Sequence, residues 1–152
     1  MKVAFHAPET SSTKPPHLLE RILAIAGTVI CLVLTAILWV SISVYQSLWP
    51  LPALYFIEMA VLSIVCGLLV FFNGDPRGQF IIWGSLGIFI AFSILGALSV
   101  GFFYLPVAII FGVIAIWSDL RKKQPIAAHV GVCLIVGMVQ VVLMLAAIHL
   151  LS

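Results

Sequence analysis

Residues 80–118 read FIIWGSLGIFIAFSILGALSVGFFYLPVAIIFGVIAIWS, and the way this apolar stretch divides decides the fold. A helix that crosses the hydrocarbon core of a bilayer needs about 17–25 residues, so the stretch is too long for one crossing. Small residues near Ser99-Val100-Gly101 permit a tight turn. Pro106 then falls in the first turn of the next helix, where proline is tolerated. The sequence therefore predicts two spans here, at about 80–98 and 102–118.

Three further apolar segments on either side are long enough to span a bilayer: about 22–44, about 51–72 and about 126–150. The turn formers of residues 73–79 and the polar connector 119–125 separate them from the central stretch. We therefore predict an all-α integral membrane bundle of five transmembrane helices in residues 18–152. Residues 1–17 are polar and contain Pro15 and Pro16, which predicts a flexible cytoplasmic tail.

The composition agrees with a membrane protein and excludes several other classes. The chain has 152 residues, of which 64% are hydrophobic and 8% are charged. Soluble globular proteins are roughly 45–50% apolar and roughly 25% charged, so this chain cannot cover a surface that faces water. A cytosolic enzyme and a nucleic-acid-binding protein are excluded on this ground. Cys31, Cys66 and Cys133 lie in apolar runs without CxxC spacing, which argues against a disulfide framework.

The distribution of basic residues predicts the orientation. With five spans, all seven Lys and Arg residues fall on one side of the membrane: Lys2, Lys14, Arg21, Arg77, Arg121, Lys122 and Lys123. Four spans would put the last three on the opposite side. Because cytoplasmic loops carry the Lys and Arg excess, we predict five spans with the N-terminus in the cytoplasm and the C-terminus outside.

Aromatic residues near the predicted span ends are consistent with this orientation, because Trp and Tyr favour the two membrane interfaces. We expect Trp39, Tyr45, Trp49 and Tyr104 at the outer interface and Trp83 and Trp117 at the inner one.

Glu58 is the one ionisable residue well inside a predicted span, about 10 Å below its outer end at about 1.5 Å per residue. A charged side chain at the bilayer centre costs at least about 2.5 kcal/mol on insertion scales. Gln140 lies at a neighbouring depth, about 15 Å from the outer end of the last span. Three interpretations stay open for these residues: a pair that joins two helices, a contact to another chain, or a proton or cation site at Glu58.

The remaining polar residues of the spans do not form a recognisable metal or catalytic motif. His129 and Cys133 are four residues apart and share a helix face, and both residue types bind zinc. The cysteine spacing is not a zinc motif, so we predict no metal site and no cofactor. His149 lies at the opposite end of the same helix, and so the two histidines cannot reach one haem iron. The chain has no HExxH motif and no predicted Ser–His pair, and we predict that it is not an enzyme.

Small residues at helical spacing predict where the helices pack. One face of the first span carries Ala24, Thr28, Cys31 and Thr35, and one face of the second carries Ala60, Ser63 and Gly67. Such stripes let two helices approach closely in a membrane. Glu58 points roughly opposite the stripe of its own span at 100° per residue. Further pairs of small residues four apart occur in the other spans: Gly87 with Ala91, Ser93 with Ala97, Ala108 with Gly112, and Ala127 with Gly131.

These features favour a non-catalytic integral membrane subunit, a packing or assembly partner in a larger membrane complex. The reasons are the small size, the short connecting segments and a carboxyl that points away from its helix's small-residue face. A small homo-oligomeric transporter or channel, with Glu58 as the proton or cation site, is the alternative. A lipid- or pigment-binding module, in which a single His could ligate the pigment, is a weaker one. The expected surroundings are the lipid bilayer, a bacterial plasma membrane, and other membrane subunits, without nucleic acid.

Overall fold

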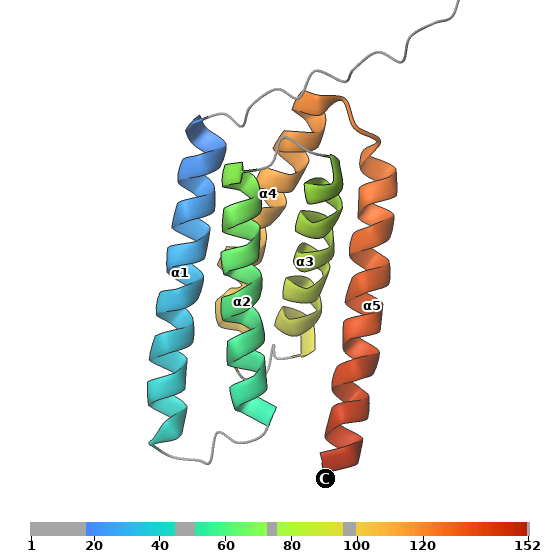
Figure 1. Cartoon of the computed structure of the whole chain (residues 1–152). Coiled ribbons are helices and arrows are strands. Elements are labelled where there is room, and N and C mark those ends of the chain that lie inside the picture. Colours follow the sequence, from blue (N-terminus) through green and yellow to red (C-terminus); the bar gives the residue numbers. More distant parts are fainter. Residues whose placement is uncertain (1–17, 45–50, 73–75, 96–99, 152) are drawn as a thin grey trace, which may run out of the picture.

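The apolar stretch 80–118 is shared between two helices, and the prediction of five helices is confirmed (Figure 1). The computed structural model describes residues 18–44, 51–72, 76–95 and 100–151, so the predicted tail at 1–17 lies outside the described residues. Each of the five α-helices in this part is long and apolar enough to cross a membrane, as expected of an integral multi-pass membrane protein. The elements are α1 (Leu18–Ser43), α2 (Leu51–Phe72), α3 (Pro76–Leu95), the 3-10 helix η1 (Gly101–Tyr104), α4 (Leu105–Lys122) and α5 (Ile126–Leu151).

The helix α3 lies at the centre of the arrangement and packs against α2, α4 and α5. At one edge of the bundle, α1 packs against α2 and α4, whereas α5 lies at the opposite edge and packs mainly against α3 (Figure 1). The central helix is more buried than the peripheral one: 61% of the most apolar window of α3 is buried, but only 11% of that of α5. The last helix therefore exposes most of its length at the rim of the bundle.

The structure corrects the predicted boundaries of α4 at both ends. Residues 119–122 are the last turn of α4 rather than part of a polar connector. The helix ends because Lys123 adopts a left-handed conformation with φ of 53°. The Lys123 N–H donates to the Leu120 carbonyl and the Gln124 N–H to the Asp119 carbonyl, which together form a Schellman stop. At the other end, η1 precedes the helix, and Pro106 lies in the first turn of α4 as predicted.

The predicted small-residue stripes of α1 and α2 lie against each other in the structure. Thr28 Oγ1 donates to the Ser63 carbonyl at 3.0 Å, and Cys31 Sγ contacts the Met59 carbonyl at 3.6 Å. A Cβ added to Gly67 would lie 2.5 Å from Thr28 Oγ1, so glycine is needed for the closeness of this crossing. Ala24 and Cys31 are fully buried, and Thr35 Oγ1 donates to the Cys31 carbonyl at 2.8 Å.

The crossing of α3 and α5 is closer still. A Cβ added to Gly87 would lie 2.2 Å from the Cys133 carbonyl oxygen, and one added to Gly137 would lie 3.0 Å from the Gly87 oxygen. The two backbones therefore meet directly at these positions. This crossing fixes the middle of α5, whose other faces have few protein neighbours.

Two of the aromatic residues expected at the interfaces instead point into the bundle. Tyr104 is fully buried, and a hydrogen bond of 3.0 Å joins its hydroxyl to Thr35 Oγ1. Trp83 is only 4% exposed. Their depth near an interface stays a prediction, and the preference of Trp and Tyr for an interface does not say which face of the helix they occupy. Trp39 and Trp117 are exposed, and Tyr45 and Trp49 lie outside the described residues.

Candidate functional site

Glu58 and Gln140 meet across the space between α2 and α5. Gln140 Nε2 donates a hydrogen bond of 2.8 Å to Glu58 Oε1. The pair lies in a groove of about 240 Å³ that is open on one side. Apart from the pair and Tyr55, the groove is lined by apolar side chains: Leu54, Leu143, Met144 and Ala147. Glu58 is partly exposed, so the pair is accessible from outside the bundle.

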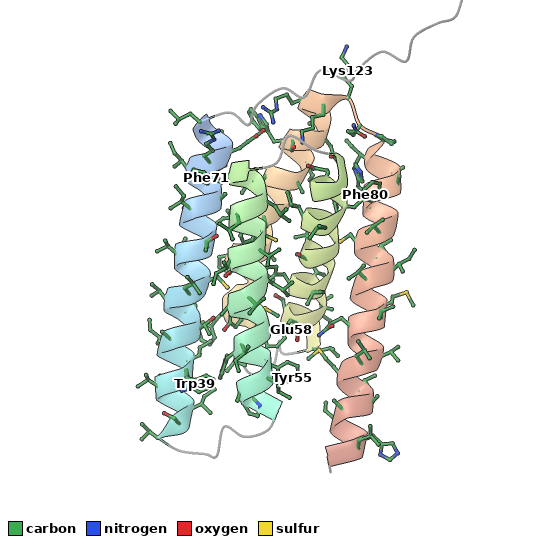
Figure 2. The ribbon with its side chains drawn as sticks, in the orientation of Figure 1. Trp39, Tyr55, Glu58, Phe71, Phe80 and Lys123 are labelled. Carbon is green, nitrogen blue, oxygen red and sulfur yellow. The ribbon has the colours of Figure 1, made fainter. Side chains whose placement is uncertain are left out.

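Tyr55 adds a second polar group to this groove. It lies three residues before Glu58 on α2, so the two side chains occupy the same helix face, in the half of the bundle away from Lys123 (Figure 2). The Tyr55 ring packs edge-on against Phe92, with ring centroids 5.0 Å apart. Its hydroxyl oxygen is buried and has no hydrogen-bond partner among the described residues. The groove therefore contains a carboxyl, a carboxamide and an unsatisfied phenol hydroxyl.

A second polar site, which the sequence did not reveal, lies near the opposite end of the bundle. Asp119 Oδ2 accepts a hydrogen bond of 2.9 Å from Trp83 Nε1 and is joined to His129 Nδ1 at 2.8 Å. The three side chains come from α4, α3 and α5, so one carboxyl oxygen connects three helices. Asp119 is 0% exposed and His129 is 1% exposed. The Phe80 ring covers the imidazole edge-on with centroids 4.7 Å apart, which encloses the site from the side of α3.

Further polar contacts lie at this end of the bundle. We call the end that contains Lys123 the inner end, and the half that contains Glu58 the outer half. Gln79 Nε2 donates to the Ala115 carbonyl at 3.0 Å, and Ser118 Oγ donates to Gln79 Oε1 at 3.1 Å. Arg121 pairs with Glu20 at 2.9 Å, which ties α4 to α1. The space left beside these residues is about 10 Å³, which is room for about one water molecule. The inner end is thus an enclosed cluster of polar side chains, in which Asp119 Oδ1 has no hydrogen-bond partner among the described residues.

The structure brings some of the predicted residues together and separates others. Glu58 and Gln140 form a pair, whereas His129 and Cys133 take part in different contacts: His129 bonds to Asp119, and Cys133 packs against Gly87. The three cysteines are free and buried. The signal for Asp119 and His129 was present in their spacing. They flank a short connector between two antiparallel helices, and this places them at a similar depth.

The two sites differ in the chemistry that they allow. Among the described residues, no group of three or more His, Cys, Asp and Glu side chains could hold a metal ion. Ser118 beside the inner site donates its hydroxyl hydrogen to Gln79, so it is not activated by His129. The inner site holds helices together, whereas the outer groove can accept a group from another molecule. No protein-family model matches this chain, and comparisons with curated proteins and with solved structures find no match.

Proposed function

We propose that this chain is a non-catalytic integral membrane subunit that assembles with another membrane protein through the groove between α2 and α5. One observation carries the proposal: the Glu58–Gln140 pair joins two helices that are long and apolar enough to span a membrane, in a groove that is open to the outside of the bundle. Lipid tails cannot form hydrogen bonds, and a carboxyl in their midst costs several kcal/mol. A protein surface that covers the groove would remove this cost, which favours association.

The peripheral position of α5 also favours assembly on the α2–α5 side of the bundle. Only 11% of its most apolar window is buried, so a neighbouring helix could pack along α5 without displacing any part of the bundle. Exposure of apolar residues to lipid is normal in a membrane and does not identify an interface by itself. The polar groove is what distinguishes the α2–α5 side from the rest of the surface.

The proposal of a non-catalytic role rests on the contents of the two sites. The outer groove has one carboxyl, and none of the side chains that line it is a His, Ser, Cys or Lys that could act with it as a nucleophile or base. The inner site has a carboxyl and an imidazole, but both are enclosed. Neither arrangement combines a reactive group with access for a substrate.

The orientation is also part of the proposal: the N-terminus in the cytoplasm and the C-terminus outside, in a bacterial plasma membrane. Arg21, Arg121, Lys122 and Lys123 lie near the ends of α1 and α4 that meet through the Glu20–Arg121 pair. The positive-inside rule makes this the cytoplasmic end. Reporter fusions at residues 48, 76, 100, 122 and 152 should be outside, inside, outside, inside and outside, respectively. A cytoplasmic reporter at residue 152 would contradict this orientation.

Purification of the tagged full-length chain from its native membranes in mild detergent tests the subunit proposal. A second membrane protein that co-purifies in fixed stoichiometry is the expected result. A symmetric oligomer of this chain alone would favour the alternative of a small transporter or channel with Glu58 as its ion site. A chain that purifies alone with a retained lipid or pigment would favour a binding module.

A further inference from the structure

We infer that the partner places a Lys or Arg side chain from one of its own membrane spans into the α2–α5 groove, against Glu58. This inference rests on the proposed assembly and specifies the chemistry of the partner. It follows from three properties of the groove, which are its charge, its shape and its unsatisfied hydroxyl.

The first property is the lack of a positively charged partner for Glu58 among the described residues of this chain. Gln140 supplies an N–H but no positive charge. Of the seven Lys and Arg residues, those that the structure describes lie at positions 21, 77 and 121–123, at the end of the bundle away from Glu58, and the other two precede α1 in the sequence. His149 is nine residues beyond Gln140 on α5, about 13 Å along the helix axis. Since ionisable residues inside membranes usually pair with one another, we look for the counter-charge of Glu58 outside this chain.

The shape of the groove suits a long basic side chain. Its volume of about 240 Å³ exceeds the cavity of about 150 Å³ that accepts a benzene molecule in an engineered protein core. Leu54, Leu143 and Met144 form apolar walls along which the methylene stem of Lys or Arg can pack. The charged end of such a side chain would then reach the carboxyl while its stem stays in apolar surroundings.

The hydroxyl of Tyr55 adds an acceptor to the same groove. It is buried and has no hydrogen-bond partner among the described residues. A lysine ammonium carries three N–H donors and an arginine guanidinium carries five, so a basic side chain that donates to Glu58 has N–H groups left for further acceptors in the groove wall.

Two other occupants fit the groove less well. A second copy of this chain has no Lys or Arg at the depth of Glu58 among its described residues, so none of these can supply the cation. A lipid ammonium group resides in the headgroup region, whereas Glu58 lies about 10 Å below the outer end of its span. A membrane-spanning helix of another protein can carry a basic residue at the depth of Glu58.

Co-purification with matched variants tests this chemistry. The wild-type chain, Glu58→Gln, the exchanged pair E58Q/Q140E and a control, Val61→Gln, are purified from native membranes under identical conditions. Val61 is 52% exposed on α2 and does not line the groove. Glu58→Gln preserves size and the hydrogen bond but removes the charge, so recovery of the partner should fall at least about tenfold. The exchanged pair restores the carboxyl within the same pair and should recover most of the partner, and Val61→Gln should bind it like the wild type.

The sequence of the co-purified partner provides the second readout, because one of its spans must contain a Lys or Arg. Equal recovery with Glu58→Gln, or a partner without a basic residue in any span, would overturn the inference while leaving the subunit proposal intact. Failure of the exchanged pair to recover more partner than Glu58→Gln would also overturn it, provided that both variants unfold at the wild-type temperature in detergent. If even the wild-type chain brings down no partner, the subunit proposal fails together with the inference.

Discussion

Asp119 and Glu58 are two carboxyls in one small bundle, and their surroundings differ in almost every respect. Asp119 is fully buried and bonded to both an indole and an imidazole, so that α3, α4 and α5 meet at one oxygen atom. Glu58 has one amide partner and lies in an open groove between α2 and α5. The same functional group is thus part of the bundle's internal structure at one end and accessible to another molecule at the other. The surroundings of a carboxyl in an apolar helix bundle, rather than its residue type, thus decide which role it can take.

Replacement of Asp119 should have the largest effect on the stability of the isolated chain. Asp119→Leu leaves Trp83 Nε1 and His129 Nδ1 buried without an acceptor. Loss of one member of such a buried group costs about 3–5 kcal/mol, and we expect a decrease of this size in the free energy of unfolding. Reversible unfolding in mixed detergent, followed by circular dichroism, measures it. A change below about 1 kcal/mol would show that the inner network does not hold the helices together.

The second prediction concerns the α3–α5 crossing, which lies between the two carboxyl sites along α5. Gly87→Ala places a methyl group where the Cys133 carbonyl stands 2.2 Å away, so the helices must separate. We expect a loss of about 1–3 kcal/mol in unfolding free energy. The matched control is Gly131→Ala on α5, because a Cβ at Gly131 meets nothing within 4 Å. Similar losses in the two variants would contradict a direct backbone contact at Gly87.

The smallest effect on stability is expected at the outer pair. Gln140→Leu removes the hydrogen bond to Glu58, and such bonds between helices in membranes contribute about 0.6–2 kcal/mol. Since the groove is open, the chain should lose about 1 kcal/mol or less and should unfold near the wild-type temperature. A loss as large as that of Asp119→Leu would remove the distinction between the two carboxyl sites.

Sequence patterns were sufficient for the helices, left the Glu58–Gln140 pair as one of three interpretations, and did not reveal the inner network. The length of the 80–118 stretch required two helices, and the depths of Glu58 and Gln140 allowed their contact. Residues 119–122 were interpreted as a connector because a run of charged and polar residues after an apolar span resembles a loop. In the structure the helix continues until the left-handed Lys123, and the extra turn carries Asp119 into the bundle. No periodicity in the sequence marks this stop, which depends on the backbone conformation of a single non-glycine residue.

Helix-packing faces were easier to predict than the orientation of aromatic side chains. The stripe that includes Thr28 and the stripe that includes Ser63 and Gly67 face each other in the structure, as their small size allows. For Trp83 and Tyr104, depth alone suggested an interface, but each side chain has a polar partner inside the bundle. The partner of each lies on a different helix, so the hydrogen bond that determines the orientation depends on tertiary structure and not on local sequence.

Site-specific photo-crosslinking in native membranes shows whether this chain assembles through the α2–α5 groove. A photoreactive amino acid replaces Leu143, which is 58% exposed and lines the groove, or Val33, which is 50% exposed on α1 at the other edge of the bundle. We expect position 143 to crosslink to a different membrane protein and position 33 to give no protein adduct. Adducts at position 143 that contain only lipid or a second copy of this chain, or a partner captured only from position 33, would contradict this expectation.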